Sequence, residues 1–315
     1  MLSGYGGNVP GGVELVVLLA SHTDIALLGL TGIIASVIIG PGQSAHRRSH
    51  IAALVPRRVV VFATDAVYKV FGVHDRVYAW IAGVHPQRRL WHFQWLSVKD
   101  LYRDLRRVLP TLRGNVLDVG CWGKPYALWL TSATSHVGID ITAGEKVDYL
   151  IREGEPWPLE SGSMQCVLCT QVLEVARDVP HIVSEIDRVL EPGGIAVVST
   201  PFFYNDTSLE IERGIYKDLW RHSFYGAQAL FTERFSILEA RRQGAFGSTM
   251  GLLLLNCIAI SMSRSGWRQL LMVALLPLWL PFCLAVNAVG WLIDKVDRTG
   301  LFYHNVFLVL RKKEL

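Results

Sequence analysis

Short apolar runs alternate with segments of helical pattern between residues 115 and 200. The runs predict β-strands at 115–119, 136–141, 163–170 and 195–200, and the segments between them predict helices at 124–132 and 178–190. Strands that alternate with helices in short units are typical of a parallel sheet with crossover helices. Such a sheet binds ligands beyond the carboxyl ends of its strands. We therefore expect a doubly wound α/β fold with its site at that edge.

The segments on either side of this pattern extend the predicted fold. Residues 59–113 predict helices, and between 95 and 108 apolar residues recur at helical spacing. Two more apolar runs, at 235–241 and 301–310, predict further strands. We expect N-terminal helices ahead of the sheet and a last strand near the C-terminus.

The chain is unusually apolar for its length of 315 residues. Hydrophobic residues make up 51 % and charged residues 18 %, whereas a soluble domain carries about 25 % charged residues. Residues 25–40 form a stretch of 16 residues without charge, which is short for a bilayer span. This stretch, within an apolar and basic leader at 1–58, is either a marginal membrane anchor or a poorly ordered segment.

A second apolar region, 248–298, separates the last two predicted strands. It holds uncharged runs at 250–262 and 270–293, and Pro277 and Pro281 interrupt the longer run, where proline would kink a helix. If the flanking strands belong to one sheet, this insert leaves and returns on the same side of a membrane. It then forms a helical hairpin, or lies in the interface without crossing. A buried helical cap is the alternative.

Basic residues gather in the first third of the chain. Residues 1–113 hold 13 Lys and Arg against 6 Asp and Glu, while the remainder holds 18 against 21. A basic region beside apolar segments suggests an anionic membrane surface as partner, and a solvated basic face is the alternative. The basic residues are scattered in pairs without a recognisable nucleic-acid module, so no nucleic acid partner is expected.

The five cysteines provide no disulfide framework. Cys166 and Cys169 have the spacing of a C-x-x-C motif, but they lie in a predicted strand, where residues three apart point to opposite faces. A zinc or redox site is therefore not expected, and we assign no metal ligands. A reducing, cytoplasmic setting is the expectation.

The first strand ends in a turn that suits a ligand. Residues 116–121 read Val-Leu-Asp-Val-Gly-Cys, and Gly120 lets the backbone turn tightly and approach a ligand closely. The amides of this loop and the N-terminus of the following helix can meet a polar or anionic group. Asp140 ends the next strand, where a carboxylate can accept both hydroxyls of a ribose. These features predict a cofactor that contains a nucleoside, without distinguishing a nicotinamide dinucleotide from S-adenosylmethionine.

The order and spacing of five motifs separate these two cofactors. Residues 114–202 resemble a class I S-adenosylmethionine-dependent methyltransferase of the type-11, ubiquinone/menaquinone methyltransferase-like kind. The segments that carry the resemblance are 117–121 (LDVGC), 138–140 (GID), 167–174 (VLCTQVLE), 185–194 (EIDRVLEPGG) and 199–202 (STPF). The resemblance implies a Rossmann-like, doubly wound sheet of seven strands and S-adenosylmethionine as the cofactor.

The resemblance also implies which residues bind the cofactor. Asp118 and Gly120 would line its methionine end, Asp140 would bind its ribose, and residues 169–171 would border the pocket at the end of the fourth strand. The full implied set is Asp118, Gly120, Cys121, Gly123, Asp140, Ile141, Cys169, Thr170 and Gln171.

Three positions depart from the family pattern. Trp122 stands where the family usually has Gly, and it either crowds the methionine end or points outward. The residues expected near adenine, 151–153, read Ile-Arg-Glu where the family places an Asp, although Asp148 lies close by. Residues 174–175 read Glu-Val in place of Glu-His. Each departure alone is tolerable, and together they leave weak or lost catalysis as an alternative.

Residues 216–223 follow the fifth strand and resemble the Asp-Tyr-Trp-Arg-Phe-Thr segment of many bacterial methyltransferases of this type. Asp218 or His222 can accept a proton from a hydroxyl nucleophile, and Arg221 can pair with a phosphate or carboxylate. We therefore name these three residues as catalytic candidates. In the alternative, Trp220 packs and Arg221 makes a structural ion pair.

These features together predict methyl transfer to a small-molecule, lipid, quinone or lipid-linked glycan acceptor, by a bacterial-type enzyme on the cytoplasmic side of a membrane. A second hypothesis is transfer to a soluble sugar or small metabolite, with the insert as a cap. The non-enzyme alternative is a degenerate domain that serves as a membrane-associated scaffold or binding module. The expected organisation is a leader (1–58), helices (59–113), a methyltransferase core (114–247), an apolar hairpin insert (248–298) and a last strand (299–315).

Overall fold

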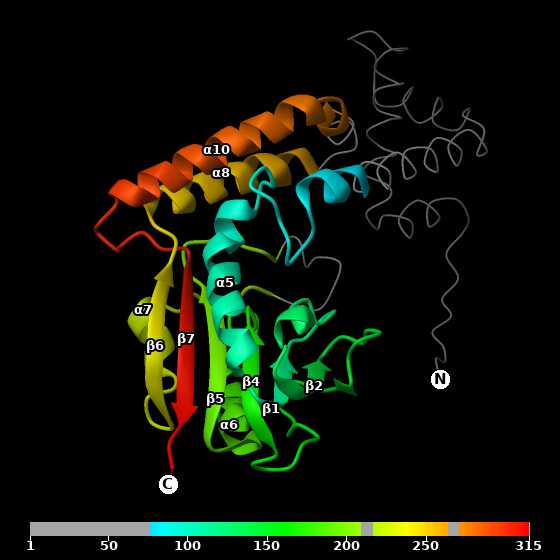
Figure 1. Cartoon of the computed structure of the whole chain (residues 1–315), viewed down its shortest axis with the longest axis vertical. Coiled ribbons are helices and arrows are strands. Elements are labelled where there is room, and N and C mark those ends of the chain that lie inside the picture. Colours follow the sequence, from blue (N-terminus) through cyan, green and yellow to red (C-terminus); the bar gives the residue numbers. More distant parts are fainter. Residues whose placement is uncertain (1–75, 209–216, 264–270, 315) are drawn as a thin grey trace, which may run out of the picture. The chain divides into compact units, whose positions relative to one another are not determined.

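The computed structural model describes residues 76–208, 217–263 and 271–314 (Figure 1). The chain divides into two compact units. The larger, the sheet unit, comprises Ala82–Cys257 and Leu280–Leu315. The described part of the other unit consists of helical stretches within 76–81, 258–263 and 271–279. The predicted leader with its apolar stretch 25–40, and residues 59–75 of the predicted helical extension, lie outside the described residues.

A seven-stranded sheet forms the centre of the sheet unit, in the order β3-β2-β1-β4-β5-β7-β6. The strands are β1 (Gly114–Val119), β2 (Ala133–Asp140), β3 (Tyr149–Leu150), β4 (Met164–Thr170), β5 (Leu190–Pro201), β6 (Phe235–Gln243) and β7 (Asn305–Lys312). The first five pair in parallel, whereas β7 lies antiparallel between β5 and β6. The prediction of a doubly wound seven-stranded α/β sheet is confirmed. The exposed β3 was not among the predicted strands because its two residues are too few to form a recognisable strand pattern.

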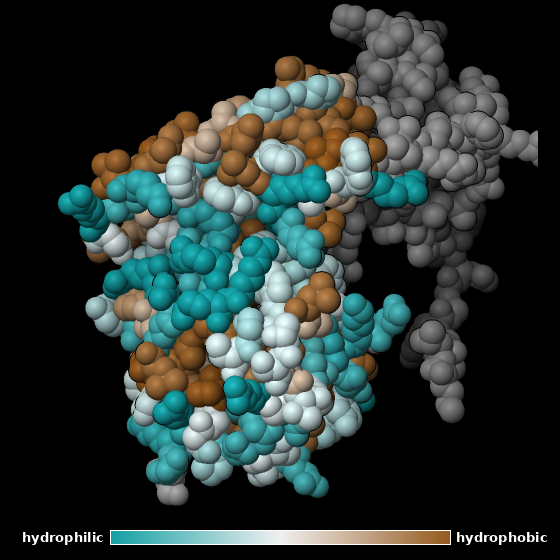
Figure 2. Space-filling view, in the orientation of Figure 1, coloured by the Kyte–Doolittle hydropathy of each residue, from teal (hydrophilic) through white to brown (hydrophobic). Residues whose placement is uncertain are grey.

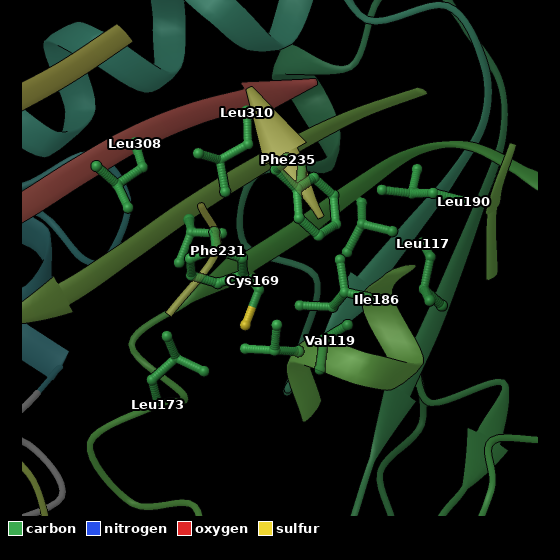
Figure 3. Close-up of a cluster of buried hydrophobic side chains, with 14 of the residues drawn as sticks. Leu117, Val119, Cys169, Leu173, Ile186, Leu190, Phe231, Phe235, Leu308 and Leu310 are labelled. Atoms are coloured by element: carbon green, nitrogen blue, oxygen red, sulfur yellow. The ribbon is translucent and has the colours of Figure 1, made fainter. Parts of the chain in front are cut away.

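Helices cover both faces of the sheet and form two hydrophobic cores. α6 (Val179–Val189) and α7 (Phe224–Ala229) bury apolar side chains against one face, and α5 (Trp95–Val108) does so against the other. Figure 3 shows the first core, where side chains of β1 such as Leu117 and Val119 meet Ile186 of α6. The Asp178 side chain accepts a hydrogen bond from the His181 amide and caps α6 at the predicted start.

Successive residues of β4 alternate between these two cores. Val167 and Cys169 lie in the first core, whereas Cys166 and Leu168 lie in the second, as the period of two in a strand requires. The prediction that Cys166 and Cys169 point to opposite faces is therefore confirmed.

The segment between β1 and β2 differs from its prediction. The helix expected at 124–132 is wrong, because the described chain has only a single 3-10 turn there, η2 (Ala127–Trp129). Trp122 and Lys124 have φ angles of 44° and 49°, a left-handed conformation that no α-helix contains. Tyr126 and Leu130 instead bury their side chains in the second core. No helix N-terminus follows the turn after β1 directly.

The apolar insert connects two strands that lie side by side. β6 and β7 pair antiparallel with Gln243 opposite Asn305, so the insert leaves and returns at one end of the sheet, which meets the condition stated from the sequence. The insert contains α8 (Phe246–Ser263) and α10 (Leu276–Val296), and α10 continues through Pro281.

Within the sheet unit, α8 and α10 run side by side beyond the end of the sheet (Figure 1). Gly247 and Gly290 allow their backbones to approach closely, because a Cβ atom on Gly247 would lie 2.1 Å from the Gly290 carbonyl oxygen. Leu96 of α5 packs against the same place, 3.0 Å from the position of a Cβ on Gly290. The hairpin is thus joined to the first turn of α5.

Candidate active site

The ends of β1, β2 and β4 lie next to one another at the carboxyl edge of the sheet. Val119 is paired with Ile139 on one side and with Cys169 on the other. Gly120 follows β1, Asp140 is the last residue of β2, and Gln171 follows β4. The Gly120 amide donates to the Ile139 carbonyl over 2.9 Å, which fixes the turn after β1 against β2.

The turn requires glycine at position 120. Gly120 has a φ of 67°, and a Cβ atom there would lie 2.5 Å from Val172 Cγ2. Asp140 secures the next residue of the turn, because its Oδ2 accepts a hydrogen bond of 2.9 Å from the Trp122 amide while its Oδ1 accepts one of 2.8 Å from the Thr142 amide. The loop amides and the end of β2 are therefore held as one arrangement.

Two hollows open at this edge and share Gly120, Trp122 and Gln171. The first, the β2 hollow, has a volume of about 370 Å³. Its walls are mainly apolar, and Asp140 supplies a carboxylate at its rim. The residues that line it are Val119, Gly120, Trp122, Asp140, Ile141, Thr142, Ile151, Arg152, Glu153, Gly154, Trp157, Gln171, Val172, Val175, Ala176, Arg177, Asp178, His181 and Ile182.

The second, the β4 hollow, has a volume of about 400 Å³ and is more polar. It lies between the end of β4, the start of α5 and the start of β7. The residues that line it are His85, Arg88, Gln94, Ser97, Val98, Leu101, Asp118, Gly120, Cys121, Trp122, Pro125, Tyr126, Thr170, Gln171, Glu174, Pro201, Tyr204, Thr207, His304 and Asn305. Trp122 is 74 % exposed, so its side chain points outward at the rim that the two hollows share.

Three titratable groups that line the β4 hollow have pKa values shifted from their ordinary ones. Burial raises the pKa of Asp118, although a hydrogen bond of 3.1 Å with His136 acts in the opposite direction. Burial and the nearby charge of Arg88 lower the pKa of His85 to about 4. Burial likewise lowers the pKa of His304 to about 4. Both imidazoles are therefore neutral at pH 7.

Glu174 is a functional candidate that sequence reasoning missed. Its side chain is buried and lines the β4 hollow, and its Oε2 has no hydrogen-bond partner among the described residues. Burial raises the pKa of Glu174 to about 8. From the sequence, position 174 was noted only as part of the Glu-Val pair that replaces Glu-His. No sequence pattern indicates where a glutamate side chain four residues after a strand will point.

Seven of the nine implied cofactor residues line a hollow. Asp118, Gly120, Cys121, Thr170 and Gln171 line the β4 hollow, and Gly120, Asp140, Ile141 and Gln171 line the β2 hollow. Gly123 lies on the loop with open space around its Cα. Cys169 does not border either hollow, because the strand period points its side chain into the first core (Figure 3). We correct its assignment to a core residue.

The segment at 217–223 holds its charged residues in pairs. The Arg221 guanidinium donates to both carboxylate oxygens of Asp218, and the Thr207 amide and hydroxyl each donate to Asp218 Oδ2 over 3.0 Å. Burial pushes the pKa of Asp218 up, but these hydrogen bonds outweigh it and hold the pKa below its ordinary value. The arrangement favours the alternative in which Arg221 makes a structural ion pair.

Trp220 and His222 complete this segment. The Trp220 indole donates to the Ala176 carbonyl over 2.7 Å. His222 is half-buried, and burial lowers its pKa. Asp218, Arg221 and His222 are absent from the residues that line the two hollows. Their catalytic role stays a prediction.

Comparisons with known proteins give one family match. Residues 117–198 match the family described as a methyltransferase domain. No curated protein matches the chain.

Solved structures of similar fold have low sequence identity. The [4+2]-cyclase SpnF is 18 % identical, with 70 % of this chain and 82 % of that chain covered and a TM-score of 0.45. An S-adenosylmethionine-dependent methyltransferase from Mesorhizobium loti is 15 % identical, with 69 % and 100 % covered and a TM-score of 0.43. The YcgJ protein from Bacillus subtilis is 16 % identical, with 68 % and 99 % covered and a TM-score of 0.42.

Proposed function

We propose that the chain transfers a methyl group from S-adenosylmethionine to a lipid or lipid-linked acceptor at a membrane surface, because residues 117–198 match the family described as a methyltransferase domain. The observation that carries the transfer is the pair of hollows that meet at Gly120, Trp122 and Gln171. A cofactor in one hollow and an acceptor in the other would meet at these shared residues.

The residues of the β2 hollow fit an adenosyl group. Ile141, Ile151 and Val172 offer apolar walls for a flat base. The Asp140 carboxylate at the end of β2 suits the two hydroxyls of a ribose. Asp118, which lines the adjoining β4 hollow, would face the methionine end. Bound there, S-adenosylmethionine supplies a methyl group already activated on its sulfonium, so the protein must chiefly align the acceptor and exclude water.

Glu174 is our candidate for the proton acceptor of the reaction. A general base works best when its pKa lies near the working pH, and burial raises the pKa of Glu174 to about 8. Its carboxylate would take the proton of an acceptor hydroxyl as the oxygen attacks. Asp218, engaged with Arg221 and Thr207, is less suited to this step.

The polarity of α10 supports the membrane part of the proposal. One face of its sheet-unit part is buried and carries Cys283, Asn287 and Gly290. The opposite face is exposed and apolar, as Figure 2 shows along the upper edge of the view. The exposed large apolar side chains of that part are Phe282, Leu284, Val289, Trp291, Leu292, Ile293 and Val296. A helix with its polar groups inward and its apolar groups outward is suited to an apolar surrounding.

The contacts of the buried face favour a helix that lies in the interface over one that crosses. α10 is long and apolar enough to cross a membrane by length and composition, with 22 % of its apolar window buried. However, the Asn287 amide group donates to the Leu90 and His92 carbonyls over 2.6 and 2.9 Å. Two turns further on, Asp294 accepts from the Ser248 amide over 2.8 Å. A helix fastened along one face lies flat against the domain.

The order of the elements supports an approach of the acceptor from the side of the insert. After α10 the chain returns through a loop to His304 and to Asn305, the first residue of β7, and both residues line the β4 hollow. An acceptor dissolved in a bilayer would thus reach the hollow from the edge of the sheet where the insert emerges. A location on the cytoplasmic side of the membrane remains an expectation.

Labelled S-adenosylmethionine, incubated with the full chain and separate lipid and aqueous extracts, tests the acceptor class. We expect label in the lipid fraction, and label confined to water-soluble products would refute the membrane acceptor. The turn after β1 lacks a following helix among the described residues, which favours the scaffold alternative. A chain that fails to bind millimolar S-adenosylmethionine would support that alternative.

A further inference from the structure

Arg88 brings a positive charge to the β4 hollow. It is the one Lys or Arg among the residues that line this hollow. Its Nε is buried without a hydrogen-bond partner, and the described residues offer its guanidinium no ion pair. Arg88 as a whole is half-buried, and a partly desolvated guanidinium without a carboxylate partner is suited to binding an anion.

Several other cations of the sheet unit are paired with carboxylates, and Arg106 and Arg242 lie over aromatic rings. Lys124 contacts Asp148 over 2.5 Å, Lys99 contacts Asp294 over 3.3 Å, and Arg221 is engaged with Asp218. Arg88 lies close instead to His85, Tyr102 and Tyr126. Burial, together with the charge of Arg88, lowers the pKa of His85, whereas burial raises the pKa values of both tyrosines although the charge of Arg88 opposes it.

The acidic residues of the hollow do not neutralise Arg88 either. Asp118 is bonded to His136. The buried Glu174 Oε2 has no hydrogen-bond partner among the described residues. Neither carboxyl group is therefore paired with Arg88 in the part of the chain that the structure describes.

We propose that Arg88 binds an anionic group, a phosphate or a carboxylate, on the acceptor molecule. A guanidinium can donate two parallel hydrogen bonds to either group. This inference rests on the proposed function, since it assigns the β4 hollow to the acceptor. Arg221, the residue expected from the sequence to bind such a group, is occupied by Asp218, so Arg88 takes that role.

The proposal narrows the acceptors to molecules with an anionic group beside the methylated atom. Glu174 and Arg88 line the same hollow, so an acceptor held by its anion at Arg88 would present a neighbouring hydroxyl or amine to Glu174. An anionic lipid headgroup and a soluble phosphorylated compound share this chemistry. The two sources are separated by the experiment.

The test is calorimetric titration of the full chain loaded with S-adenosylhomocysteine, the product form of the cofactor. The probes are inorganic phosphate, dihexanoylphosphatidylglycerol and uncharged dihexanoylglycerol. The variants are Arg88→Gln and Arg88→Lys, with Arg89→Gln as the control. Arg89 lies over the Trp91 ring and does not line the hollow.

We expect an anionic probe to bind the wild type and Arg89→Gln equally, Arg88→Gln at least ten-fold more weakly, and Arg88→Lys in between. If the binding of inorganic phosphate depends on Arg88, the acceptor is a soluble phosphorylated compound. If only the binding of dihexanoylphosphatidylglycerol depends on Arg88, the acceptor is a lipid with an anionic headgroup. Affinity for S-adenosylmethionine should stay within two-fold in every variant, which also reports on folding.

Equal binding of the anions by Arg88→Gln, or no anion binding by a loaded wild type, would overturn the role of Arg88 alone. Loss of S-adenosylmethionine binding only in Arg88→Gln would also overturn it, because the arginine would then serve the cofactor. A wild type that does not bind S-adenosylmethionine would overturn the proposed function itself.

Discussion

Three residues other than glycine adopt left-handed backbone conformations around the proposed site. Trp122, Lys124 and Gln171 have φ angles of 44°, 49° and 56°, which cost on the order of 1 kcal/mol each or more. Hydrogen bonds hold them in place: the Gln171 amide donates to the Ser199 carbonyl over 2.9 Å, and its side chain donates to Asn305 over 3.0 Å. Strain that surrounding contacts maintain is typical of a functional site.

Replacing Glu174 with Gln should change how stability depends on pH. The pKa of Glu174 is raised by burial from 4.5 to about 8, so the folded state holds a proton that the unfolded state releases between these values. Stability therefore falls as pH rises from about 4.5 to about 8. Glu174→Gln removes this loss, so its free energy of unfolding relative to the wild type should grow across that window.

Urea unfolding at pH 4 to 9 measures this difference. Glu160→Gln is the matched control, since Glu160 is exposed and lies outside both hollows, and its difference from the wild type should stay constant. A constant difference for Glu174→Gln as well would show that the carboxyl titrates normally.

At the residue scale, the sequence predicted those positions whose role follows from the end of a strand. Gly120 follows β1 directly and lines both hollows, and Asp140 ends β2 and lines the β2 hollow. Cys169 was predicted to border the cofactor pocket, but the alternation of side chains along β4 directs its side chain into the first core. Arg88 and Glu174 could not be predicted, because only the packing of a loop before α5 and of the loop after β4 brings them into one hollow.

At the scale of elements, the strands followed from their apolar runs, whereas the helix after β1 did not form. The apolar spacing of 124–132 satisfies either a helix or a packed loop. The left-handed backbone at Trp122 and Lys124, together with Pro125, excludes a helix at this point. Burial of the Tyr126 side chain in the second core stabilises the loop. Local spacing cannot report such tertiary packing.

Introducing charge on the exposed face of α10 should weaken membrane binding. Leu292 is 56 % exposed, and inserting a leucine side chain into an apolar phase contributes roughly 1.5–3 kcal/mol. Leu292→Asp should therefore reduce binding to vesicles of phosphatidylglycerol and phosphatidylcholine by roughly ten-fold or more, as measured by co-sedimentation.

Leu238→Asp is the control for this measurement. Leu238 is 48 % exposed but lies on β6, so its variant should bind vesicles like the wild type. Unaltered binding by Leu292→Asp would contradict an interfacial α10, and the insert would then be a cap on the domain.

At the scale of the whole molecule, the sheet unit contains all residues of the proposed site and those parts of α8 and α10 that adjoin β6 and β7. β7 runs antiparallel to β5 with Asn305 opposite Pro201, so the insert joins the sheet at the carboxyl edge, where the hollows open. A chain of side-chain hydrogen bonds runs from Gln171 through Asn305 and Gln243 to Asp104 of α5. The site, the last strand and the N-terminal helix are thereby linked in one polar network.

Calorimetric titration of S-adenosylmethionine into the wild type and Asp140→Asn tests the central claim most directly. We expect one molecule of cofactor to bind per wild-type chain, and at least ten-fold weaker binding by Asp140→Asn, because the amide replaces a charged acceptor of the ribose hydroxyls. Equal affinity in both proteins, or no binding by the wild type, would contradict the account of this edge of the sheet as a cofactor site.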